Sequence, residues 1–125
     1  MRKYLSITDV IYIHEELIKE FGGTDGIRDK NQLDAAVMRP QNGYYVNLIE
    51  EASALMESLA MNHCFIDGNK RIAFFATDTF LRLNGFSISC DSEEGHNFFV
   101  KNLETNNFRF EIIKNWLEEK VVEIK

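Results

Sequence analysis

Residues 63–73 read HCFIDGNKRIA, and the interpretation of the whole chain depends on this stretch. It lies between two long segments whose apolar residues recur at helical spacing, and Asp67-Gly68 is a turn signal between them. His63 falls at the predicted end of the first helix and Asn69 at the predicted start of the second. The stretch is therefore either an ordinary helix-to-helix turn or a loop that holds phosphates beside a base.

Apolar residues at helical spacing on both sides of this stretch predict a chain that is helical throughout. The first expected helix runs from a cap at Thr8 or Asp9 to about residue 21, and the next three cover about residues 31–38, 47–62 and 69–83. A fifth helix is expected to begin at a cap at Asp91 or Ser92, and a sixth at a cap at Asn106 or Asn107. Residues 86–90 alternate weakly and indicate a short extended piece. The Glu-rich end from Glu118 indicates a solvated helix end.

The helix expected over residues 69–83 has apolar side chains around much of its circumference, so we expect it to be the central and most buried helix. The fold class that follows is all-α, a compact bundle of about six helices. We expect residues 1–125 to form a single domain, because this length corresponds to one domain and suffices for a sizeable core.

The composition excludes several classes of protein. The chain carries 14 basic and 20 acidic residues, a formal net charge of −6, so we expect no direct contact with nucleic acid. No apolar run approaches the length of a membrane span, and residues 1–3 lead into no signal-peptide stretch, so we expect a cytoplasmic protein without a membrane partner. Cys64 and Cys90 form no metal-binding spacing, and we expect two reduced thiols.

The second half of the stretch 63–73 has the composition of an anion site. The N-terminus of a helix offers unpaired N–H groups and a partial positive charge. Gly68 lets the backbone approach a ligand closely, and Asn69 can cap the helix or hold the loop shape. Lys70 and Arg71 place two cations in the first turn, where the helix dipole disfavours them. An anion at this point removes that conflict, and phosphate is the expected one because Arg binds it in a bidentate fork.

The first half of the stretch adds an acid and a base. An acid such as Asp67 beside a phosphate site commonly binds Mg²⁺. A neutral imidazole such as that of His63 accepts a proton near pH 7. Together these groups indicate phosphoryl or nucleotidyl transfer. We interpret Phe65 as an anchor of the loop in the core, and His14 as a structural or exposed residue.

Residues 63–71 resemble the signature of the Fic/Doc (Fido) superfamily, in its Doc branch. The Doc branch reads approximately H-x-F-x-[D/N]-[A/G]-N-K-R, and the Fic branch reads H-P-F-x-[D/E]-G-N-G-R-x-x-R. The likeness covers nearly the whole chain and includes residues 5–10, 13–15, 21–29, 33–40 and 80–85. The resemblance implies the Fido fold, a small α-helical bundle.

The resemblance also implies a role for each matching position. His63 corresponds to the catalytic base that activates a target hydroxyl. Asp67 corresponds to the acid associated with Mg²⁺ or substrate, and Gly68 and Asn69 to the nucleotide- and phosphate-binding loop. Arg71 corresponds to the arginine that binds phosphate. Lys70, which is also expected to bind phosphate, decides the branch, because Fic enzymes have glycine there.

The resemblance implies a toxin that uses Mg²⁺ and transfers the γ-phosphate of ATP to a hydroxyl of elongation factor Tu. It also implies a Phd-like antitoxin that binds this toxin and holds it inactive. One alternative is Fic-type AMP transfer, which Gly68 favours because Doc itself has alanine there. Phe74 stands in place of the second Fic arginine and argues against that alternative. The other alternative is a catalytically silent antitoxin-binding module, which Phe75 favours because it replaces a polar residue.

Overall fold

The computed structural model describes residues 1–124 as a bundle of six α-helices with a 3-10 helix and a two-stranded sheet. The elements in chain order are α1 (Ile7–Phe21), α2 (Lys30–Met38), η1 (Arg39–Gln41), α3 (Leu48–Met61), α4 (Asn69–Leu83), β1 (Phe86–Ile88), α5 (Ser92–Glu104), α6 (Phe110–Lys120) and β2 (Val121–Glu123). The all-α bundle expected from the sequence is confirmed. None of the helices in residues 1–124 has the length and apolar content needed to cross a membrane.

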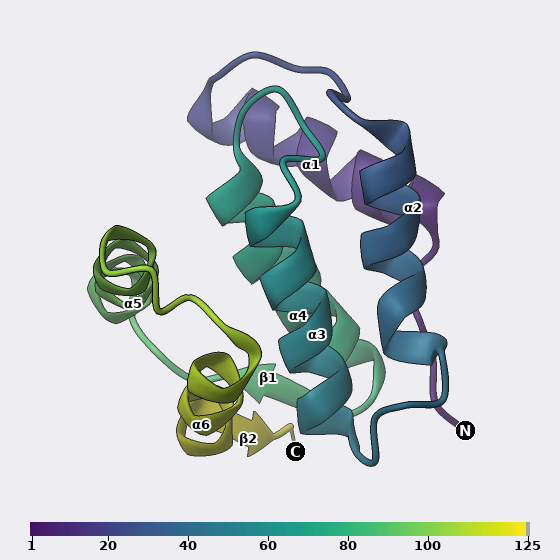
Figure 1. Ribbon diagram of the computed structural model, residues 1–125, viewed down its shortest axis with the longest axis vertical. Coiled ribbons are helices and arrows are strands. Elements are labelled where there is room, and N and C mark those ends of the chain that lie inside the picture. The colour runs from purple at the N-terminus through teal and green to yellow at the C-terminus, as the bar shows by residue number, and fades with distance from the viewer. Residues whose placement is uncertain (125) are drawn as a thin grey trace.

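The antiparallel pair α3 and α4 forms the centre of the bundle (Figure 1). Helices α1 and α2 pack on one side of this pair, and α5 and α6 lie on the other. The short strands β1 and β2 pair antiparallel, with Phe86 opposite Glu123. The α3–α4 loop and the α1–α2 connection lie together at the end of the molecule opposite to this sheet (Figure 1).

The most buried helix is α3, so the expectation that α4 would be most buried was wrong. Nine residues of α3 are buried, compared with six in α4. Small residues such as Ala52, Ser53 and Ala54 let neighbouring helices approach α3 closely, but they contribute little to a hydrophobic pattern. Helix α4, in contrast, exposes the apolar side chains of Phe75 and Leu83.

Two helices begin earlier than expected. Helix α1 is capped by Ser6, and not by Thr8 or Asp9, because Ser6 and Asp9 form a capping box in which each side chain accepts the other residue's N–H. Helix α2 begins at Lys30, one residue before the expected start, because the side chain of Asp29 caps it. Asp91 caps α5 as expected.

The last helix differs from the expectation at both ends. It begins at Phe110, and the expected caps at Asn106 or Asn107 are wrong. A carboxylate oxygen of Glu57, in α3, accepts the N–H of Phe110 at 2.9 Å, so a distant side chain replaces a local cap. Glu118 and Glu119 are exposed in its last turn, as expected for a solvated helix end, but the helix ends at Lys120 and the residues that follow form β2.

Candidate active site

The α3–α4 loop changes direction at two residues with positive φ. His63 follows the last turn of α3 with φ of 52°, and Gly68 precedes α4 with φ of 78°. Between them, Cys64 and Phe65 turn into the core and are almost fully buried, whereas Asp67 is exposed. A histidine in the left-handed region costs backbone energy, and such residues occur preferentially at functional sites. The loop therefore presents the exposed His63 side chain on a constrained backbone.

The side chain of Asn69 holds the loop together. Its Oδ1 accepts the N–H of Phe65 at 3.0 Å, and its Nδ2 donates to the carbonyl of Phe65 at 2.9 Å. Of the two roles expected for Asn69, the structure thus shows the second, since the N-cap residue of α4 is Gly68. Both hydrogen bonds tie the start of α4 to the buried part of the loop.

The N-terminus of α4 is open to a ligand. Gly68 has no side chain, and no side chain of residues 1–124 caps this terminus. Helices α1, α2, α3 and α5 are each capped by the side chain of their own N-cap residue, and α6 is capped by Glu57. The N–H groups of the first turn of α4 are therefore available to an anion, as expected from the sequence.

The two cations of the stretch 63–73 lie in this first turn and are exposed. The guanidinium carbon of Arg71 lies 4.5 Å from the ring centroid of Phe21, the last residue of α1. A cation–π contact of this kind supports the guanidinium without using its hydrogen-bond donors. Arg71 and Lys70 thus carry positive charge at the open helix terminus.

Asp67 is exposed, and both of its carboxylate oxygens already accept a backbone hydrogen bond. Oδ2 accepts the N–H of Thr24 at 3.1 Å, and Oδ1 accepts the N–H of Gly68 at 2.8 Å. These two bonds, with a smaller contribution from the charge of Arg71, lower the pKa of the Asp67 carboxyl below its ordinary value. The carboxylate is therefore ionised at neutral pH.

An ionised carboxylate with lone pairs to spare is a suitable ligand for Mg²⁺. Nowhere in residues 1–124 do three His, Cys, Asp or Glu side chains gather closely enough to hold a metal ion. Magnesium at a phosphate site usually takes one or two protein carboxylates and completes its shell with phosphate oxygens and water. The single carboxylate of Asp67 fits that donor set only when a nucleotide is bound as well.

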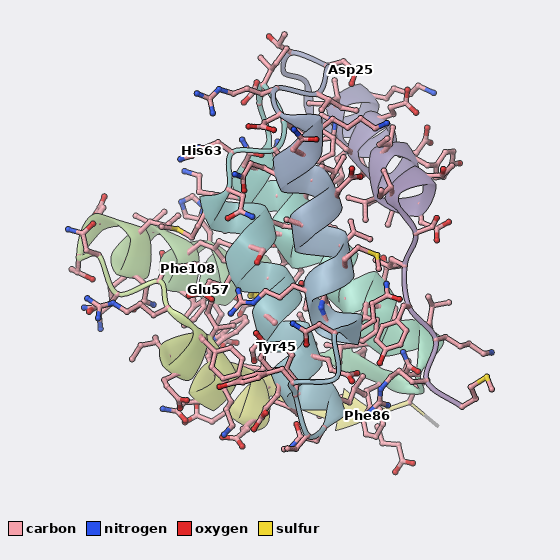
Figure 2. All side chains as sticks on the ribbon, turned by 45° about the vertical axis from the view of Figure 1, so that its right-hand side comes forward. Asp25, Tyr45, Glu57, His63, Phe86 and Phe108 are labelled. Carbon is pink, nitrogen blue, oxygen red and sulfur yellow. The ribbon has the colours of Figure 1, made fainter. Side chains whose placement is uncertain are left out.

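The α1–α2 connection pairs with the loop, which the sequence did not predict. Ile27 and Phe65 form an antiparallel bridge, and the N–H of Ile66 donates to the carbonyl of Gly26 at 3.0 Å. The labelled side chains of Asp25 and His63 accordingly lie toward the same end of the molecule, away from Phe86 (Figure 2). Extended pairing between segments this far apart leaves no periodic signal in a single sequence.

The loop is also anchored in the core through Phe65, as the sequence predicted. Phe65 is 1% exposed, and its ring stacks on that of His14 with a centroid separation of 3.8 Å. His14 is structural, one of the two interpretations left open for it, and it is buried next to the loop. Nothing in the sequence indicated that His14 would contact this loop.

Phe74 and Phe75 occupy different environments. The Phe74 ring packs between α4 and α5, 6.4 Å from the Phe99 ring and against Gly95. The position of the second Fic arginine is therefore occupied by a packing residue. Phe75 is 37% exposed and lies 6.2 Å from the ring of Phe21, beside the Arg71 contact.

Cys64 directly follows His63 but is not available as a nucleophile. Burial, assisted by the charge of Asp29, raises the pKa of the Cys64 thiol to about 11. The thiolate is the reactive form, so at neutral pH the native protein holds Cys64 as an unreactive thiol. The loop and the first turn of α4 accordingly carry an exposed imidazole, an ionised carboxylate and two cations, but no thiolate.

We expect alkylation by iodoacetamide at about pH 8 to modify Cys90 well before Cys64 in the native protein. The expected difference follows from the full burial of Cys64 and the partial exposure of Cys90. Peptide mass spectrometry after timed quenching measures both rates, and urea-unfolded protein serves as the control in which the two rates converge. Equal rates in the native protein would contradict the assignment of Cys64 as buried and inert.

Comparison with known proteins shows the family of this chain. Residues 4–81 match the model of the Fic/DOC family, which is more than half of the chain and includes α1 to most of α4. The chain therefore belongs to the Fic/DOC family.

Within that family its similarities lie in the Doc branch. The chain is 43% identical over 96 residues to a protein named Toxin Doc from Mycolicibacterium smegmatis (strain ATCC 700084 / mc(2)155), an alignment that covers 73% of this chain and 72% of that protein. It is 29% identical over 90 residues to a protein named Protein kinase doc from Escherichia phage P1, with 69% and 71% of the two chains covered.

Proposed function

We propose that this protein is a Doc-type toxin that transfers the γ-phosphate of ATP to a hydroxyl group of a translation factor, with elongation factor Tu as the expected target. The names of the two relatives, a toxin and a protein kinase, support the proposal. The main structural support for the proposal is the position of Lys70 and Arg71 in the first turn of α4. Among the α-helices of residues 1–124, α4 is the one whose N-terminus no side chain caps. A Phd-like antitoxin is the expected partner that holds the toxin inactive.

The phosphates of ATP would bind at the first turn of α4. Its free N–H groups and the helix dipole attract the anion, and Lys70 and Arg71 add two full charges. Gly68, with its positive φ and no Cβ, leaves the backbone accessible at this point. Mg²⁺ bound by Asp67 and the phosphate oxygens would neutralise part of the negative charge of the nucleotide.

His63 would act on the hydroxyl of the target. Its exposed imidazole accepts the hydroxyl proton while the hydroxyl oxygen forms a bond to the γ-phosphorus. The bond between that phosphorus and the oxygen that bridges to ADP breaks, and ADP leaves with the electron pair of that bond. Because Cys64 is buried as a neutral thiol, we infer direct transfer to the target rather than a phosphorylated cysteine intermediate.

AMP transfer is the second candidate, and Gly68 is the residue that favours it. Two observations favour phosphate transfer instead. Phe74 packs against α5 where the Fic pattern has a second arginine, so that phosphate contact has no counterpart here. Lys70 is exposed in the first turn of α4, where it adds a charge to the phosphate site that the Fic glycine lacks. A silent antitoxin-binding module is the third candidate, and it predicts no transfer at all.

Lys70→Gly tests whether this residue determines the branch. Removing a charge aimed at a transferring phosphate is expected to lower phosphate transfer to elongation factor Tu by about a hundredfold. Lys70→Arg, the matched control, keeps the charge and is expected to retain most of the activity. The intact mass of the target distinguishes a phosphoryl from an adenylyl adduct. Full phosphate transfer by Lys70→Gly would show that Lys70 does not act on the nucleotide.

A further inference from the structure

His14, in the middle of α1, forms a hydrogen bond to the α3–α4 loop. Its Nε2 lies 2.7 Å from the carbonyl oxygen of Asp67. A carbonyl oxygen only accepts hydrogen bonds, so Nε2 must carry the proton and donate it. The ring is 1% exposed and stacks on Phe65 with an angle of 9° between the planes, which fixes the direction of the N–H.

Two hydrogen bonds involve the peptide group that joins Asp67 to Gly68: its carbonyl accepts from His14 Nε2, and its N–H donates to Asp67 Oδ1. Gly68 has φ of 78° and no Cβ, so rotation of this peptide meets little steric resistance. A carbonyl turned toward the first turn of α4 would place a partial negative charge beside the N–H groups that are available to an anion. The bond to His14 holds the carbonyl toward α1 instead.

Other contacts from the same part of the chain hold Asp67 in the same place. The N–H of Thr24 donates to its carboxylate, and the backbone of Gly23 lies so close that a Cβ there would be 2.7 Å from Asp67 Oδ2. Asp25 Oδ1 lies 3.6 Å from Nδ1 on the other side of the His14 ring. His14 in the middle of α1 therefore holds the carbonyl of Asp67, and the connection after α1 holds its carboxylate.

We infer that His14 is a positioning residue for the transfer reaction: by donating from Nε2 to the carbonyl of Asp67, it keeps that carbonyl away from the phosphate site at the N-terminus of α4. This inference rests on the proposed function, because it assigns His14 a task in the same site. His14 itself contacts no substrate in this arrangement. Its effect reaches the nucleotide through the Asp67–Gly68 peptide.

Three variants separate positioning from ordinary packing. His14→Leu removes the donor and keeps an apolar side chain, whereas His14→Gln places an amide N–H near the position of Nε2. Val10→Ala is the matched control, because Val10 is fully buried on the same helix and its truncation removes packing but no hydrogen-bond donor. The kcat and KM of phosphate transfer are measured for each, with thermal unfolding to confirm that the variants are folded.

The expected result is a kcat for His14→Leu that is about tenfold to a hundredfold below wild type, because a small misplacement of a reacting group has an effect of this size. The KM for the protein target should not change, His14→Gln should recover most of the kcat, and Val10→Ala should keep the wild-type kcat. A wild-type kcat in His14→Leu would overturn the inference. An equal loss of kcat in Val10→Ala would also overturn it.

A second measurement does not depend on transfer activity. The amide resonances of residues 68–71 are followed while ATP and Mg²⁺ are added in the absence of a target. They should shift in wild type and in His14→Gln, and much less in His14→Leu. If wild type transfers nothing, the proposed function fails, and these resonances still decide the role of His14. Equal shifts in His14→Leu and wild type, or no shift in wild type, would overturn the inference that His14 is a positioning residue.

Discussion

Replacement of His63 by alanine is expected to lower phosphate transfer by about 10²-fold to 10⁴-fold, the usual contribution of a general base. The imidazole is exposed at the end of α3 and can reach a hydroxyl group on another protein. The substitution removes the proton acceptor but leaves the open N-terminus of α4 unchanged, so ATP binding should persist. Initial rates with labelled ATP and elongation factor Tu measure the loss. Full activity in His63→Ala would contradict the mechanism.

His63→Gly provides a control that distinguishes chemistry from folding. The backbone at residue 63 has φ of 52°, which glycine adopts freely and alanine does not. We therefore expect His63→Gly to be as inactive as His63→Ala but more stable than it by about 1 kcal/mol. Urea unfolding of the two variants measures this difference. A glycine variant less stable than the alanine variant would contradict the left-handed conformation at this position.

The second large effect is expected from Phe65→Ala, which should lower the free energy of unfolding by about 3–5 kcal/mol. Phe65 is 1% exposed, packs on His14 and carries the backbone groups that Asn69 binds. The cavity left by the ring would therefore affect the core and the loop together. Since a domain of this size is usually stable by only about 5–15 kcal/mol, a large share of the stability depends on this residue.

Phe75→Ala is the matched control for Phe65→Ala. The Phe75 ring is 37% exposed, so its removal should change the free energy of unfolding by less than about 1.5 kcal/mol. Urea denaturation of both variants with a common m-value provides the comparison. Equal losses in the two variants would contradict the assignment of Phe65 as the anchor of the loop.

Local signals were sufficient to predict much of this fold. The spacing of apolar residues predicted α3 and α4 and the loop between them, and Asp91 was correctly expected at the start of α5. Such features depend on residues a few positions apart, which a single sequence shows directly. The interpretation of Phe65 as an anchor of the loop in the core is confirmed by its burial.

The features that were missed depend on residues far apart in the chain. Glu57 caps α6 from 53 positions away, and the strand after α6 forms only because β1 lies beside it. The hydrogen bond from His14 to Asp67 likewise spans 53 positions. The burial of α3 was underestimated for another reason, since alanine and serine pack closely without raising the hydrophobic signal.

Of the candidate site, the sequence predicted only the residues that lie close together along the chain. The sequence identified His63, Asp67 and the cations of α4. The structure shows His63 exposed in the α3–α4 loop, Asp67 exposed next to Gly68, and Lys70 and Arg71 exposed in the first turn of α4. Their roles in transfer stay predictions. Only the three-dimensional structure showed the contacts that hold this loop and Arg71 in place. These are the hydrogen bond from His14, the pairing with residues 26–28 and the contact between Arg71 and Phe21.

The central claim is that the loop and the first turn of α4 transfer the γ-phosphate of ATP. The most direct test incubates the purified protein, Mg²⁺ and elongation factor Tu with ATP labelled at either the α- or the γ-phosphate, alongside His63→Ala. We predict label on the target from the γ-position alone, and none with His63→Ala. Label from the α-position would contradict it and establish AMP transfer, and no label from either position, with this target or with total lysate, would indicate a silent binding module.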